Sequence, residues 1–278
     1  MPLIQNSYGK GRVRVMRVAR EGEHNEVREV TALIMLEGDF AAAYTAGDNR
    51  TVIATDTIKN IAYIVAREEL TACNEAFGEK LATRFLSRYP QVSSATVTLH
   101  ETKWARASFG RVPHGHSFVL DANGKPYARV NATREGVEVT SGITGYTFMK
   151  TTGSGWVGYV QDDYTVLPET TDRIAATAMD ATWTWFAPPA DYPAANAAVL
   201  GTMLEVFGTT YSHGVQDSLL RMGEAALARV PEVRQISMAC PNKHYLPVRL
   251  EPFGMSSDNT VFNPTDEPHG QIECTVGR

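Results

Sequence analysis

The chain has 278 residues, of which 43% are hydrophobic, 21% charged and 9% aromatic, and its 26 basic and 31 acidic side chains give a formal net charge of −5. This composition predicts one large or two ordinary folded domains, and it excludes a disordered or collagen-like chain. Net acidity argues against a nucleic-acid partner or an anionic membrane surface, although a local pocket for one small anion stays open.

Three cysteines, Cys73, Cys240 and Cys274, lie far apart in the sequence. Their odd number and wide spacing predict neither a disulfide framework nor a thiolate zinc site. The first residues lack the basic region and long apolar stretch of a signal peptide, and apolar runs such as residues 30–36 are too short for the roughly 20 residues that span a bilayer. We therefore expect a soluble, cytoplasmic protein.

Hydrophobic periodicity in the first half of the chain predicts two strands, two helices and two more strands. The first helix carries isoleucine and valine on one face, with Thr55 or Asp56 as its N-cap. The predicted strands span residues 13–18, 29–36, 94–100 and 117–120, and the predicted helices span residues 57–67 and 74–88.

The second half repeats this order of elements. Its predicted strands span residues 135–140, 146–150, 157–160, 233–239, 244–250 and 260–262, and its predicted helices span residues 195–207 and 215–230. We therefore expect two similar domains, 1–134 and 135–278, of the α+β class. Each would place helices on one face of an antiparallel sheet.

Two polar segments are candidates for chemistry. Residues 51–60 join a predicted strand to a helix start, where backbone N–H groups can face an anion, although an ordinary helix cap explains them as well. Asn242 and His244 lie two apart on one side of a predicted strand. Such a pair can position a water and move its proton, but it can equally be structural.

Residues 150–173 combine aromatic side chains with one arginine. Trp156 and Arg173 suit a flat anionic ring, because the indole can stack on it while the guanidinium donates paired hydrogen bonds. A core of aromatics with a surface arginine is the alternative. His114 and His116 share one side of a strand, but no third ligand is close in sequence, so we expect no metal.

Six ordered segments carry a resemblance to a known family. The chain resembles the urate oxidase (uricase) family, of the bacterial type, over nearly its whole length. The segments are Tyr8-Gly9-Lys10, Ala54-Thr55-Asp56-Thr57-Ile58-Lys59-Asn60, Pro113-His114-Gly115-His116-Ser117-Phe118, the pattern over 150–173, Val215-Gln216, and Pro241-Asn242-Lys243-His244-Tyr245.

The resemblance implies the tunnelling fold, with two tandem domains that each combine an antiparallel sheet with two helices. It further implies a homotetramer whose sheets close into a barrel, with active sites at subunit interfaces. The implied reaction is the oxidation of urate by molecular oxygen and water to 5-hydroxyisourate and hydrogen peroxide. Neither a metal nor an organic cofactor is implied.

The resemblance also implies roles for ten residues. Three match a proton relay that strips the purine of protons until it can give electrons to oxygen, and the others match contacts to substrate. The relay is Lys10, Thr55 and His244. The contacts are the gripping pair Arg173 and Gln216, backbone groups of Asp56 and Val215, the wall residue Leu167, Asn242 beside oxygen or water, and the stacking ring Trp156.

One residue departs from the family pattern. Trp156 stands where the family has a stacking phenylalanine. The larger indole can stack as well, or it can crowd the pocket so that the pocket wall must move. The alternative functions are a tunnelling-fold enzyme for another purine or a pterin, and a binding protein without catalysis. A binding protein needs Arg173 and Gln216 but not the relay, so the presence of Lys10, Thr55 and His244 favours an enzyme.

Overall fold

A computed structural model describes residues 1–20 and 22–278, which form two compact units. The first unit comprises Met1–Gly142 with Ala190–Pro193, and the second comprises Ile143–Pro189 with Ala194–Arg278. Both contain antiparallel strands and helices, so the predicted α+β class is confirmed.

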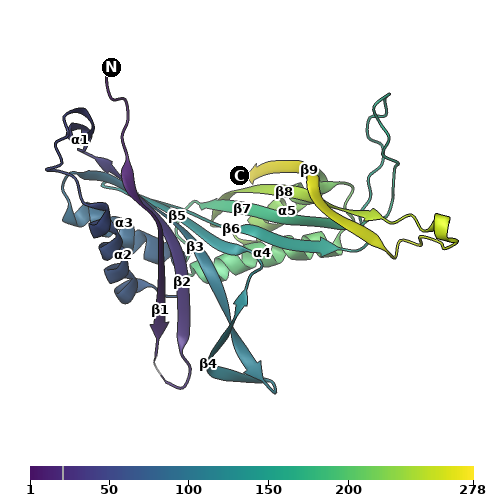
Figure 1. The fold of residues 1–278 in the computed structure, drawn as a ribbon, viewed down its shortest axis with the longest axis horizontal. Coiled ribbons are helices and arrows are strands. Elements are labelled where there is room, and N and C mark those ends of the chain that lie inside the picture. The colour runs from purple at the N-terminus through teal and green to yellow at the C-terminus, as the bar shows by residue number, and fades with distance from the viewer. Residues whose placement is uncertain (21) are drawn as a thin grey trace. The chain divides into compact units, whose positions relative to one another are not determined.

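In the first unit, the strands follow the order β1-β2-β3-β5, and β4 pairs with the outer part of β3. Helices α2 and α3 pack on one face of this sheet (Figure 1). The elements are β1 (Tyr8–Ala19), β2 (Glu26–Gly38), α1 (Ala41–Thr45), α2 (Thr55–Glu69), α3 (Asn74–Arg88), β3 (Val92–Phe109), β4 (Val112–Asp121) and β5 (Lys125–Thr133).

The core of the first unit lies between this sheet and its two helices. Every second residue of β2 from Val30 to Leu36 is at most 1% exposed, as expected for a strand with one covered face. From α3, Phe77, Leu81 and Phe85 are fully buried at spacings of four. The alternating apolar residues of β2 and the apolar face of α3 therefore form one buried layer.

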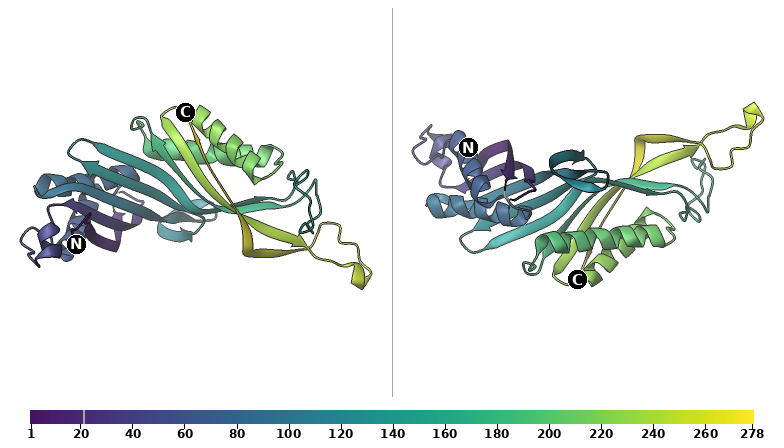
Figure 2. Two further views of the ribbon diagram at one scale, coloured as in Figure 1. Left: turned by 90° about the horizontal axis from the view of Figure 1, so that it is seen from above. Right: turned by 90° about the horizontal axis from the view of Figure 1, so that it is seen from below.

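In the second unit, the strands follow the order β6-β7-β8-β9, and α4 and α5 lie on one face (Figure 2). Trp183 of β7 is buried and donates from Nε1 to Asn196 Oδ1 of α4 at 3.0 Å. The elements are β6 (Val137–Lys150, of this unit from Ile143 on), β7 (Ala175–Trp185), α4 (Tyr192–Thr209, of this unit from Ala194 on), α5 (Val215–Arg229), β8 (Val233–Pro247), the short 3-10 helix η1 (Glu251–Phe253) and β9 (Phe262–Gly277).

Three local expectations are wrong. Of the strand expected over residues 260–262, only Phe262 lies in a strand, as the first residue of β9. Residues 157–160 form no strand, because this stretch belongs to a loop with two isolated bridges, Ser154 with Ser212 and Trp156 with Thr170. The N-cap of α2 is Ala54, so Thr55 and Asp56 already lie inside the first turn. Within residues 1–20 and 22–278, no helix has both the length and the apolar character needed to cross a bilayer.

Candidate active site

Strand β1 brings Lys10 close to the start of α2. The Tyr8 hydroxyl accepts a hydrogen bond from the backbone N–H of Ile53 at 2.7 Å, which ties β1 to the segment that leads into the helix. Lys10 itself is half-buried and precedes a bulge, where the register against β2 shifts before Val13. The anchored tyrosine and the bulge together fix the place of the lysine.

Thr55 and Asp56 occupy the first turn of α2 and are exposed. The Asp56 carboxylate accepts hydrogen bonds from Lys59 at 2.5 Å and from Asn60 at 3.0 Å. The hydrogen bond from Lys59 is the main reason why the pKa of Asp56 is lowered, and the charge of Lys10 adds to it. The Asp56 carboxylate is therefore engaged by hydrogen bonds within α2. The backbone N–H of Asp56 is the group that can bind a ligand.

Gly9 gives the first testable prediction, because β1 and β2 approach closely beside it. A Cβ at this position would lie 1.8 Å from the Ile34 carbonyl oxygen. We expect Gly9→Ala to lower the free energy of unfolding by about 3 kcal/mol, since the strands must separate. Gly11→Ala is the matched control, because its nearest neighbour is Leu33 Cδ1 at 3.8 Å. Thermal unfolding compares the two variants, and equal midpoints would contradict this reading.

The loop between β6 and β7 fixes both the backbone and the indole ring of Trp156. Its backbone N–H donates to the Thr170 carbonyl at 2.7 Å, and the Thr170 N–H donates back at 3.1 Å. The Tyr159 ring stacks on the indole with centroids 5.6 Å apart and an interplanar angle of 13°. The Tyr159 hydroxyl donates to the carbonyl of Leu167, whose side chain is exposed. The indole therefore has a fixed orientation.

Arg173 follows the same loop and lies over the indole. Its guanidinium Cζ is 5.8 Å from the centroid of the Trp156 ring, and its backbone N–H donates to the Ser154 carbonyl at 2.8 Å. Burial lowers the pKa of the Arg173 guanidinium. Its Nε is buried and has no hydrogen-bond partner among residues 1–20 and 22–278. A buried donor without an acceptor is costly, so a ligand that supplies one is favoured here.

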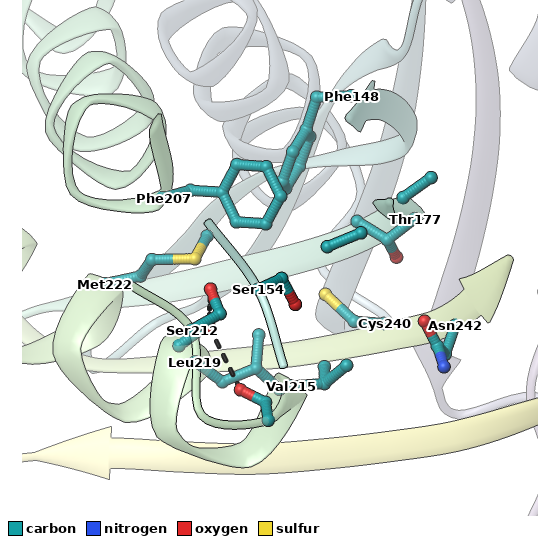
Figure 3. A pocket seen from close by; sticks show the side chains of 14 residues that line it. Phe148, Ser154, Thr177, Phe207, Ser212, Val215, Leu219, Met222, Cys240 and Asn242 are labelled. Carbon is teal, nitrogen blue, oxygen red and sulfur yellow. Dashed lines mark hydrogen bonds between the residues drawn. The ribbon is translucent and has the colours of Figure 1, made fainter. Parts of the chain in front are cut away.

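Val215 and Gln216 are the first two residues of α5. Val215 lines a cavity together with Ser154 of the β6–β7 loop and Asn242 of β8 (Figure 3). The Ser218 hydroxyl donates to the Ser212 hydroxyl at 2.7 Å on one side of this cavity. Its free volume is about 30 Å³, room for one or two waters. As it stands in one chain, this cavity is therefore too small for a purine.

Asn242 and His244 lie on β8, where the pairing with β9 is irregular. Asn242 pairs with Gly270, whereas His244 pairs with Thr265. The register shift between them means that β9 carries extra residues at this point, and Lys243 binds the bulged Asp266 at 3.1 Å. Both predicted residues are half-buried. Asn242 lines the same cavity as Val215, and His244 lies two residues further along β8.

The predicted residues thus fall into two groups. Trp156, Leu167, Arg173, Val215, Gln216, Asn242 and His244 lie in the second unit and are called the Arg173 group. Lys10, Thr55 and Asp56 lie in the first unit and are called the Lys10 group. The Arg173 group offers an aromatic face, a cation with a free donor and two amides. This set matches a planar anion with acceptors along its edge.

The two histidines of β4 contact each other. The His114 and His116 rings are 4.5 Å apart at 68°, and His114 also meets the edge of Phe109. Within the residues that the structure describes, no three His, Cys, Asp or Glu side chains come together in a group that could hold a metal ion.

The sequence patterns do not indicate two neighbours of Arg173. Tyr211 donates from its hydroxyl to the Thr171 carbonyl at 2.8 Å, and its ring meets His213 at 5.0 Å. Ser154 holds the Arg173 backbone and is 1% exposed. Both residues are placed beside Arg173 by the course of a loop, and no sequence motif links them to it. For Tyr211, the sequence signal is an aromatic residue in the short connection between α4 and α5.

Known proteins resemble this chain along its full length. The sequence model of a family described as Uricase matches residues 6–131 and 139–273. The uricase of Arthrobacter globiformis is 37% identical over 276 residues, covering 99% of this chain and 90% of that protein. The uricase of Dictyostelium discoideum is 36% identical over 280 residues, covering 99% and 97%. The crystal structure of the Arthrobacter globiformis uricase aligns with a TM-score of 0.94 at 37% identity, covering 100% of this chain and 95% of that one.

Proposed function

Because the chain belongs to the uricase family and is a urate oxidase, an oxidoreductase with the tunnelling fold, we propose that it converts urate, oxygen and water into 5-hydroxyisourate and hydrogen peroxide. The observation that carries the site is the buried Nε of Arg173, which lies beside the fixed indole of Trp156 and has no hydrogen-bond partner in the described part of the chain. Urate is a planar anion with adjacent oxygen and nitrogen acceptors, which a guanidinium fork can meet with two hydrogen bonds.

Substrate binding uses three contacts of the Arg173 group. The indole of Trp156 stacks on the purine face, and Arg173 donates to one edge of the ring. Gln216, at the exposed start of α5, binds the opposite edge through its amide, which both donates and accepts. Pairing the buried Nε removes a penalty of about 1 to 3 kcal/mol. Affinity and orientation thus come from the same residues.

Proton transfer uses Lys10, Thr55 and His244. Urate must lose protons before its dianion can give electrons to oxygen, and a lysine with a threonine hydroxyl can carry those protons away. His244 exchanges protons with the water that adds to the ring, while Asn242 holds oxygen or that water. The reaction balances, since two electrons leave urate, oxygen becomes peroxide, and water supplies the new hydroxyl.

The two groups meet across a subunit interface in this proposal. The Lys10 group lies in the first unit of the chain and the Arg173 group in the second. We propose a homotetramer in which the Lys10 group of one subunit completes the Arg173 group of another. Each site is then formed only in the assembled protein.

The proposed reaction is tested with purified protein in a metal-free buffer. We expect the ultraviolet absorbance of urate to fall while one oxygen is taken up and one peroxide is formed for each urate. Tight binding of urate without turnover would contradict the enzyme. Turnover of another purine or a pterin, with urate unchanged, would favour a relative with a different substrate.

Trp156→Phe gives a second prediction. The phenyl ring keeps an aromatic face beside Arg173, although its stacking area is smaller than that of the indole. We expect the variant to oxidise urate, with binding weakened by about threefold. Steady-state kinetics give both values, and Trp185→Phe, on β7, controls for the loss of a tryptophan. Complete loss of turnover in a folded variant would contradict a simple stacking role.

A further inference from the structure

Gly214 directly precedes α5 and is the N-cap of that helix. Its backbone is extended, with φ 178° and ψ 171°, a conformation that any residue adopts. No side chain caps the helix at this position, although serine, threonine, aspartate or asparagine would supply a favourable hydrogen bond there. The backbone therefore does not require glycine, and a capping side chain would be slightly favoured over it.

The space around Gly214 does require glycine. A Cβ at this position would lie 2.8 Å from Trp156 Cζ3 and 3.2 Å from Cε3, and 3.3 Å from the Gln216 side-chain oxygen. The indole cannot yield easily, because Tyr159 stacks on it and Thr170 holds its backbone in both directions. Because residue 214 has no side chain, the Trp156 ring and the Gln216 side-chain oxygen can both lie close to its backbone.

We propose that Gly214 is a positioning residue that sets the places of Trp156 and Gln216 relative to each other, and so fits the site to a flat purine. The inference rests on the proposed function, in which the indole stacks on the purine face and the amide binds its edge. Any side chain at 214 would push these two groups apart. A planar ligand that needs both contacts would then lose one of them.

The contact with Trp156 predicts a specific coupling between two positions. The atoms Cζ3 and Cε3 belong to the benzene half of the indole, which a phenyl ring does not reproduce. Alanine at 214 should therefore conflict with tryptophan at 156 but fit beside phenylalanine. Residues in contact show such non-additive effects, whereas independent residues do not.

The experiment compares Gly214→Ala and Gly214→Ser in the wild-type chain and in Trp156→Phe. Binding of urate is measured without oxygen by calorimetry, turnover is measured with oxygen, and folding is measured by thermal unfolding of the assembled protein. Gly201→Ala on α4 is the matched control, because nothing lies within 4 Å of its added Cβ.

In the wild-type chain, we expect each substitution at 214 to weaken urate binding by about tenfold or more. In Trp156→Phe, the same substitutions should weaken binding by about threefold or less. Gly214→Ser should lower the thermal midpoint less than Gly214→Ala, because its hydroxyl can cap α5. This combination separates positioning from a general role in folding.

Equal losses in both backgrounds, or unchanged binding in the wild-type chain, would overturn the role of Gly214 while leaving the proposed function intact. A fall in thermal midpoint that parallels the fall in affinity would also overturn it. A wild-type chain that neither binds nor oxidises urate would overturn the proposed function, and this inference with it.

Discussion

Arg173→Gln should bind urate about 100-fold more weakly than the wild-type chain, a loss of about 3 kcal/mol. The guanidinium lies over Trp156, and its buried Nε has no acceptor among residues 1–20 and 22–278. Glutamine removes the charge and the fork of paired donors. Arg173→Lys should rescue little, since an ammonium keeps the charge but not the planar fork. Anaerobic calorimetry with urate measures both variants.

Arg234→Gln is the matched control for this prediction. Its guanidinium also lies over an aromatic ring, that of Phe186 at 5.3 Å, but the side chain is exposed. We expect its urate affinity to equal that of the wild-type chain. If a folded Arg173→Gln chain bound urate as tightly as the wild-type chain, Arg173 would not be part of the binding site.

Thr55→Ala and Lys10→Met should lower turnover by about 100-fold to 10,000-fold, the usual contribution of a positioned proton-transfer group. Binding of urate should change by about threefold or less, because the proposed relay acts in the transition state and the proposed substrate contacts belong to the Arg173 group. Single-turnover kinetics with pre-bound urate separate the two effects, since oxygen then starts the reaction.

Thr57→Ala is the control for Thr55. Thr57 is exposed in the first turn of the same helix, two residues further on, and is not part of the Lys10 group. We expect nearly unchanged turnover. If Thr55→Ala and Lys10→Met weakened binding as much as turnover, both residues would merely bind substrate.

The helices follow well from the sequence, because their apolar faces repeat at the helical period. Residues 74–88 coincide with α3, and the prediction over 215–230 ends one residue beyond α5. Strands are harder to place. β8 is one continuous strand from Val233 to Pro247, although the polar residues at its centre divide it into two predicted pieces. β7 contains many alanines and threonines and shows no clear alternation of apolar residues in the sequence.

The candidate site is predictable from motifs, but its geometry is not. Adjacent residues identify Thr55 with Asp56 and Val215 with Gln216 as pairs. The place of Trp156 depends on bonds to Thr170 and a stacked Tyr159, which arise from a loop without periodicity. The expected crowding by the indole is resolved at Gly214, a residue that no spacing rule connects to position 156.

A complementation experiment tests most directly whether the Lys10 group and the Arg173 group of different subunits act on one urate. Lys10→Met and Arg173→Gln chains are produced together with different affinity tags, and assemblies that carry both tags are isolated. If the groups come from different subunits, about one quarter of randomly assembled sites combine two intact groups, so turnover should reach about a quarter of the wild-type value. Turnover no higher than that of the single variants would contradict a site shared between subunits.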